Sequence, residues 1–86
     1  MQDVEGGVTM TEFDNLKNSY IAAIHWGLAA NASYHEAKQG NDILHKFCES
    51  LVESSNCLDS TKIAMKQELE LLKEALSKEI DSYYRG

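Results

Sequence analysis

The sequence predicts an all-α fold, an antiparallel helical hairpin or a three-helix bundle, from three observations. The chain has no proline, which suits long uninterrupted helices and disfavours a loop-rich fold. Its apolar residues recur at spacings of three and four, the spacing of a helical face. The segment 18–35 carries no Asp, Glu, Lys or Arg in an otherwise charge-dense chain. A soluble helix of that length normally keeps a charged face, so this segment is expected to meet protein on more than one side.

The chain of 86 residues is expected to form a single helical domain over 9–86, preceded by a flexible tail over 1–8. The tail contains a Gly-Gly pair and no periodicity. Thr9 and Glu12 have the spacing of a capping box, and Val8 and Phe13 that of a hydrophobic staple. At this length, oligomerisation often adds to the stability that a small core provides.

The first helix is predicted to run from about residue 10 to residue 39, about 43 Å at 1.5 Å per residue. Gly40 is expected to end it, because glycine adopts the left-handed conformation at low cost. Two faces emerge at 100° per residue. The core stripe holds Phe13, Leu16, Tyr20, Ile24, Gly27, Asn31 and Tyr34, and the opposite face holds Ala22, His25, Trp26, Ala29 and Ser33.

This opposite face is the candidate partner-binding site. Small residues let another backbone approach closely, and Trp26 beside them is a large amphipathic anchor of the kind enriched at binding hot spots. The alternative is structural, because alanine is simply the best helix former and Trp26 can cover the edge of the intramolecular core.

A short second helix is predicted over 42–54, with Asn41 as its cap and Asp42 near the positive end of its dipole. Its apolar positions recur every three or four residues: Ile43, Leu44, Phe47, Cys48, Leu51 and Val52. The Ser- and Asn-rich segment 54–60 then favours a turn. In the alternative, helix two bends through this segment and continues as one long second arm.

The third helix is predicted over 60–84, capped by Asp59. It has the most regular repeat in the chain: Met65, Leu69, Leu72, Leu76, Ile80 and Tyr83. This repeat is typical of coiled-coil packing. Leu71 lies off the stripe and is a second candidate for a partner contact.

Charge and cysteine content exclude several classes of protein. The formal net charge is −6, which is unfavourable for binding phosphate backbones, so nucleic-acid binding is not expected. The polar residues spread through 18–35 argue against membrane insertion. Without an apolar leader and with only two cysteines, the chain is expected in the reducing cytoplasm. Cys48 is expected in the core; a bridge to Cys57 is the alternative.

No enzymatic chemistry is predicted, and neither a catalytic residue, a metal site nor a cofactor is expected. The nearest approach to a metal site is a meeting of His35 and His45 across a hairpin at Gly40, with Glu49 or Cys48 nearby. No CxxC or HxxxH spacing supports it. No group is placed to act as an oxyanion hole or to orient a cysteine–histidine pair.

The function predicted is that of a small protein–protein interaction module, adaptor- or chaperone-like, that self-associates as a homo-oligomer or docks a partner through the first helix. One alternative is an acidic inhibitor of the antitoxin, immunity or phage counter-defence type, which blocks a basic site on its target. Charge-driven inhibition weakens steeply with ionic strength, whereas apolar docking barely responds. Another alternative is a structural subunit of a larger assembly.

Overall fold

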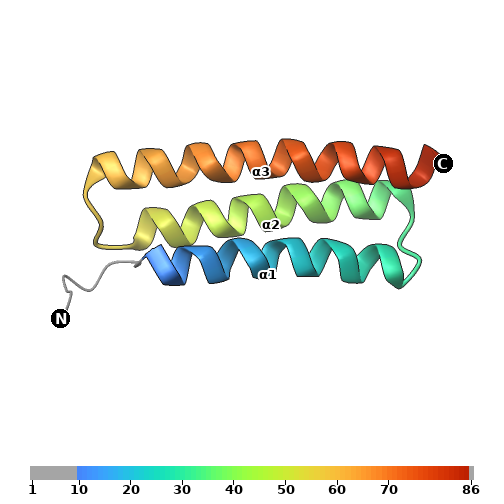
Figure 1. The fold of residues 1–86 in the computed structure, drawn as a ribbon, viewed down its shortest axis with the longest axis horizontal. Helices are drawn as coiled ribbons and strands as arrows, with labels where there is room; N and C mark the ends of the chain where they lie inside the picture. Colours follow the sequence, from blue (N-terminus) through green and yellow to red (C-terminus); the bar gives the residue numbers. More distant parts are fainter. Residues whose placement is uncertain (1–9, 86) are drawn as a thin grey trace.

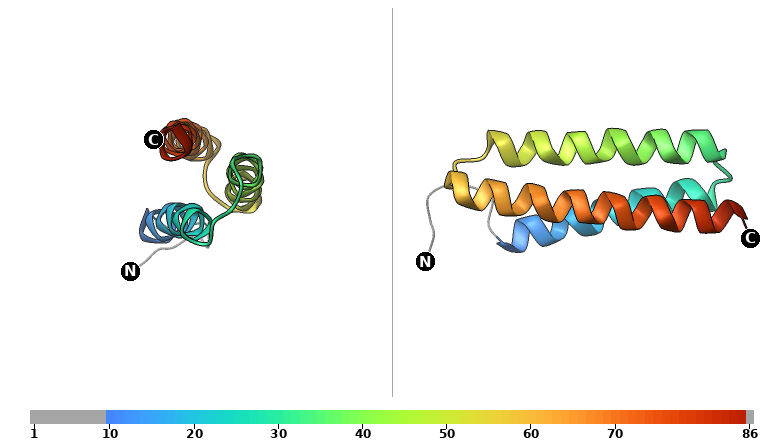
Figure 2. Two further views of the ribbon diagram at one scale, coloured as in Figure 1. Left: turned by 90° about the vertical axis from the view of Figure 1, so that its right-hand side faces the viewer. Right: turned by 90° about the horizontal axis from the view of Figure 1, so that it is seen from above.

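The computed structural model, which describes residues 10–85, is a three-helix bundle about 46 Å long. Its helices are α1 (Met10–Ala29), α2 (Tyr34–Ser54) and α3 (Asp59–Arg85), and no strand occurs between residues 10 and 85. The chain runs up, down and up, so that α1 and α3 are both antiparallel to α2 (Figure 1). Seen end-on, the helices form a triangle (Figure 2). The predicted all-α class is therefore confirmed in its three-helix form.

The first helix is shorter than predicted: it ends at Ala29 and not near residue 39. Asn31 adopts a left-handed conformation, with φ of 67°. The N–H of Ala32 donates to the Gly27 carbonyl at 3.0 Å, and the N–H of Asn31 to the Leu28 carbonyl at 3.1 Å. This is the Schellman pattern, with asparagine in the position usually taken by glycine. Asn31 thus ends the helix nine residues before Gly40.

The second helix begins at Tyr34, eight residues before the predicted start at 42. Ser33 is its N-cap: its hydroxyl accepts from the N–H of Glu36 at 3.1 Å, and the Glu36 carboxylate accepts from the N–H of Ser33 at 2.9 Å. This capping box satisfies two N–H groups that the first turn leaves unpaired. Gly40 and Asn41 are therefore interior residues of α2, and the prediction of a helix end and a cap there is wrong.

The third helix follows the prediction closely, beginning at Asp59 and not Ser60 and ending at Arg85. Residues 55–58 separate it from α2, so the alternative of one long second arm is wrong. The predicted stripe is buried at Met65, Leu69, Leu76 and Ile80, with Leu72 partly buried against the core. Tyr83 is the exception, because it is 54 % exposed.

The core is assembled from one face of each helix. From α1 it receives Phe13, Tyr20, Ile24 and Leu28. The predicted stripe is confirmed at Phe13, Tyr20 and Ile24, with Leu16 partly buried. It is wrong for Asn31 and Tyr34, which are exposed and lie beyond the end of α1. From α2 it receives Ala37, Cys48 and Val52 together with two polar residues, Asn41 and His45. Cys48 and Cys57 are not joined by a disulfide.

Two other expectations concern the chain ends and the membrane. The tail over 1–8, and with it the capping box and staple that involve Thr9 and Val8, lies outside the described residues. Among residues 10–85, no helix is both long and apolar enough to cross a bilayer.

Candidate functional site

The α1 surface, defined by Ala22, Trp26, Ala29 and Ala30, comprises three residues of the predicted partner-binding face and Ala30, which directly follows α1 and is not among the predicted residues. All four residues are exposed, and Trp26 is 79 % exposed, the largest exposed fraction among the large apolar side chains described. Trp26 lines a shallow depression with His25, Ala29 and Ala30. No charged side chain occurs on α1 after Lys17, so this surface is apolar.

The other two residues predicted for this face are engaged within the bundle. His25 lies on the side of α1 nearest α3, where its Nε2 is 2.8 Å from Oε2 of Glu79. Ser33 is the N-cap of α2 and does not lie on α1 at all. The five predicted residues therefore do not share one helix face, because α1 ends before Ser33.

A second exposed apolar feature lies on α2 and is called the α2 row. It consists of Ile43, Phe47 and Leu51, which are 59, 57 and 40 % exposed. Residues four apart lie on the same side of a helix, so the row runs along one side of α2. These residues belong to the apolar repeat predicted for the second helix, but of that repeat only Cys48 and Val52 are buried, with Leu44 partly buried.

The reason is the register in which α2 packs. Its buried positions are Ala37, Asn41, His45, Cys48 and Val52. Two of these positions hold polar residues, which sequence reasoning does not assign to a core. Burying the side of α2 that carries Asn41 and His45 leaves the Ile43–Phe47–Leu51 side facing outward.

Three charged residues of α2 pair with α3 along the border between the two helices. Lys38 Nζ is 3.0 Å from Oδ1 of Asp81. Asp42 Oδ1 is 3.1 Å from Nζ of Lys73, and Glu53 pairs with Lys66. The Lys73 and Lys46 ammonium groups lower the pKa of the Asp42 carboxyl through hydrogen bonds and charge. These pairs leave the α2 row without a charged member.

One buried polar contact connects all three helices. The Tyr20 hydroxyl of α1 donates to the Asn41 side-chain carbonyl of α2, and Asn41 Nδ2 donates to the Lys73 backbone carbonyl of α3 at 3.1 Å. Tyr20 and Asn41 are only 1 and 2 % exposed. Burial raises the pKa of the Tyr20 phenol well above its usual value. This contact satisfies two polar side chains that would be costly to bury alone.

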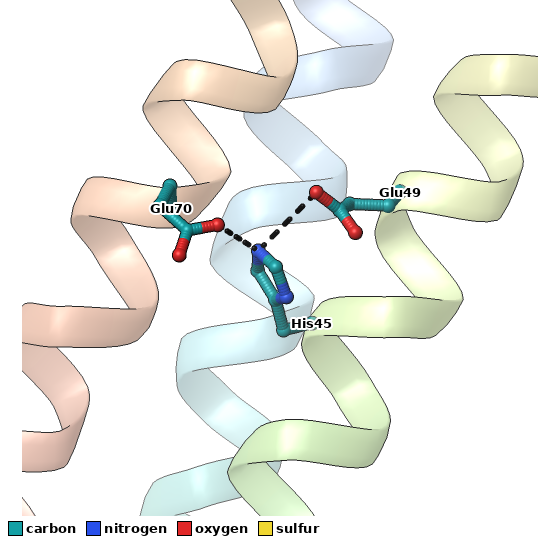
Figure 3. Close-up of side chains that lie close together, drawn as sticks. All are labelled: His45, Glu49 and Glu70. Carbon is teal, nitrogen blue, oxygen red and sulfur yellow. Dashed lines mark ion pairs between the residues drawn. The ribbon is translucent and has the colours of Figure 1, made fainter.

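The second buried polar residue of α2, His45, lies between two carboxylates (Figure 3). It is 5 % exposed. Its Nε2 is 3.2 Å from Oε1 of Glu70 on α3 and 3.6 Å from Oε2 of Glu49, one turn along α2. Neither contact has hydrogen-bond geometry, and this nitrogen has no hydrogen-bond partner. One ligand atom from each of the three residues lies within 4.8 Å of the others.

Sequence reasoning missed this cluster, although it considered Glu49 near His45. The hairpin predicted at Gly40 would have allowed His35 and His45 to meet across it. Both histidines instead lie on α2, about 15 Å apart along the axis. The available signal was the four-residue step from His45 to Glu49, which places both side chains on one side of a helix. Glu70 is brought to them only by the packing of α3.

Comparison of the chain with protein-family models, with curated proteins and with solved structures finds no match.

Proposed function

We propose that this protein is a non-enzymatic helical interaction module that acts as a homodimer, with the α2 row as the contact between copies. The observation that carries this proposal is the row itself: three large apolar side chains, each at least 40 % exposed, aligned on one helix with no charged member. A contiguous exposed apolar patch on a small protein is typical of an interaction site.

The second copy is the favoured occupant because the row is complementary to itself. In an antiparallel pair of α2 helices related by a two-fold axis at Phe47, Ile43 of one copy lies opposite Leu51 of the other. The two Phe47 rings meet at the centre. A two-fold contact of this kind uses the same patch on both copies and closes after two subunits. Lys38, Asp42 and Glu53 of α2 are paired with α3 and are not part of the row.

The α1 surface is the second part of the proposal, and it supplies the adaptor function. A dimer that uses the α2 row leaves Trp26 in solvent with small residues beside it. A tryptophan flanked by alanines fits a hot spot, in which a large anchor is surrounded by positions where a partner backbone approaches closely. We infer that this surface receives an apolar helix from a protein partner.

The test is the solution mass, measured by size-exclusion chromatography with light scattering over a wide concentration range in reducing buffer. Phe47→Ser and Trp26→Ser are the matched variants, because each removes one exposed aromatic from one surface. We expect a dimer for the native chain and for Trp26→Ser, and a monomer for Phe47→Ser. Circular dichroism should show the same helicity in all three, since neither side chain belongs to the core.

Two results would overturn the proposal in different ways. A native chain that is monomeric at every concentration would remove self-association. If Trp26→Ser dissociates the dimer and Phe47→Ser does not, the contact between copies lies on the α1 surface and not on the α2 row.

Trp26 also provides a direct readout for the partner surface. It is the only tryptophan in the chain and lies largely in solvent. Its fluorescence should therefore have the red-shifted maximum of an exposed indole, unchanged between monomer and dimer. Dimerisation accompanied by a blue shift would show that the α1 surface is covered by the second copy and is not available to a partner.

A further inference from the structure

We propose that His45, Glu49 and Glu70 form a binding site for a divalent transition-metal ion of the zinc class. The imidazole nitrogen and two carboxylate oxygens are the donor set that such ions accept, and they come from adjacent helices that face each other (Figure 3). The site is separate from both apolar surfaces, so it does not depend on the proposed homodimer.

The distances between the donor atoms agree with a shared ion. Ligand atoms at about 2.0 to 2.2 Å from a tetrahedral Zn²⁺ ion lie about 3.4 Å from one another. The His45 nitrogen is 3.2 Å from the Glu70 oxygen and 3.6 Å from the Glu49 oxygen. The two carboxylate oxygens lie within 4.8 Å of each other. Both glutamate side chains are partly exposed, so they have room to rotate toward a shared ion.

The burial of His45 distinguishes this cluster from an ordinary surface group of charges. A buried ring nitrogen without a hydrogen bond is costly, and it normally has a partner. The ring of His45 points its Nε2 between the two carboxylates (Figure 3), yet it has hydrogen-bond geometry to neither. Elsewhere in the bundle, His25 and Glu79 form a hydrogen bond at 2.8 Å. The His45 nitrogen is therefore oriented as a ligand and not as a donor to one carboxylate.

Charge and position indicate what such an ion would do. Two carboxylates balance the charge of a divalent ion, and the imidazole adds a neutral ligand. Because His45 and Glu49 belong to α2 and Glu70 to α3, the ion would connect the two helices near their middle. Binding to the folded chain alone stabilises it by mass action, so the metal would raise the thermal midpoint.

The experiment is a titration of the full chain with Co²⁺, followed by the visible absorption that this ion gains in a low-coordinate protein site, and then by displacement with Zn²⁺. Glu49→Gln and Glu70→Gln each remove one ligand charge at a partly exposed side chain, so the fold is retained. We expect saturable binding of one ion per native chain and at least about a tenfold loss of affinity in each variant.

The matched control is Glu79→Gln, which removes the carboxylate beside the other histidine–glutamate pair. It should bind Co²⁺ as the native chain does. Zn²⁺ should raise the thermal midpoint of the native chain and of Glu79→Gln, and much less that of Glu49→Gln or Glu70→Gln. The proposal is overturned if the native chain shows no saturable Co²⁺ absorption. Unchanged affinity in both ligand variants, or loss of binding in Glu79→Gln alone, would also overturn it.

Discussion

The pair formed by α2 and α3 is held together differently from α1. Ion pairs follow the border of α2 and α3 at Lys38–Asp81, Asp42–Lys73 and Glu53–Lys66. The first helix has three polar links to α3: Lys17–Glu68 at 2.7 Å, His25–Glu79 at 2.8 Å, and the Tyr83 hydroxyl to the Leu28 carbonyl at 3.3 Å. Contact is most extensive between α2 and α3 and least between α1 and α3, and α1 is inclined to α3 when the bundle is seen from above (Figure 2).

The two parts of this small bundle are therefore stabilised by different kinds of contact. Charged pairs add little stability each at a surface, but a series of them favours one register of α2 against α3. The first helix depends on its four buried side chains, Tyr20 among them, and carries no charged side chain after Lys17. Elements with fewer contacts open more readily, so we expect α1 to be the first helix to detach. It is also the helix whose exposed side is suited to a partner.

The largest effect should come from the core of the α2–α3 pair. Leu69 is fully buried, and Leu69→Ala removes its contacts and leaves a cavity, at a cost of about 2 to 5 kcal/mol. That loss is a large part of the stability of a domain this size, so the urea midpoint of the whole bundle, followed by circular dichroism, should fall strongly.

Leu71→Ala is the control on the same helix, since Leu71 is 67 % exposed. Its effect should stay within about 0.5 kcal/mol. Equal losses in the two variants would mean that α3 is rotated about its axis relative to the structure described.

These two leucines also illustrate what the sequence predicts well. The repeat in α3 is periodic and long, so which residues face the core can be read directly from it. The segment around Asn31 could not be read in this way, because its apolar spacing continues through a helix end that asparagine and a capping box produce. The signal was the Ser33–Glu36 pair, which has the capping-box spacing. If the helix end at Asn31 is overlooked, Asn41 takes the place of an N-cap and Gly40 that of the glycine that ends a helix.

The prediction of the candidate site residues depends on the same helix end at Asn31. Trp26 keeps the exposed position expected for it, whereas Ser33 leaves the face because α1 has already ended. The α2 row could not be foreseen, because an apolar pattern alone does not reveal that Asn41 and His45 occupy core positions. Glu70 joins His45 only through packing between helices that are distant in sequence.

An intermediate effect on stability is expected from breaking the polar contact that joins α1 to the α2–α3 pair. Tyr20→Phe removes the hydroxyl and leaves the buried Asn41 oxygen without this donor, at a cost of about 1 to 3 kcal/mol. Urea denaturation near neutral pH measures it. Tyr83→Phe is the control, because its hydroxyl bonds the Leu28 carbonyl at 3.3 Å from a half-exposed ring, and it should change stability by less than about 0.5 kcal/mol.

The same residue gives a prediction in alkaline solution. The raised pKa of Tyr20 means that the folded chain holds this proton at a pH where the unfolded chain has lost it. This contribution is complete below the usual tyrosine pKa of about 10 and is lost as the pH rises above it, by about 1.4 kcal/mol per pH unit. The native chain should therefore lose more stability than Tyr20→Phe between about pH 9 and about pH 11. Equal losses would show that the phenol is accessible to solvent.

The smallest effects are expected from two stabilising glycine substitutions, the larger of them at Gly40. This residue is inside α2, and a Cβ built on it meets no atom within 4 Å. Gly40→Ala should therefore raise the free energy of unfolding by about 0.4 to 1 kcal/mol, because alanine has fewer unfolded conformations to lose. Gly27→Ala in the last turns of α1 is the comparison, with the added carbon 4.0 Å from Ala32 Cβ. It should stabilise α1 by less, since helix ends fray. If Gly40→Ala destabilised the chain, the glycine would have to adopt the left-handed conformation of a helix end, and α2 would start where the apolar pattern first placed it.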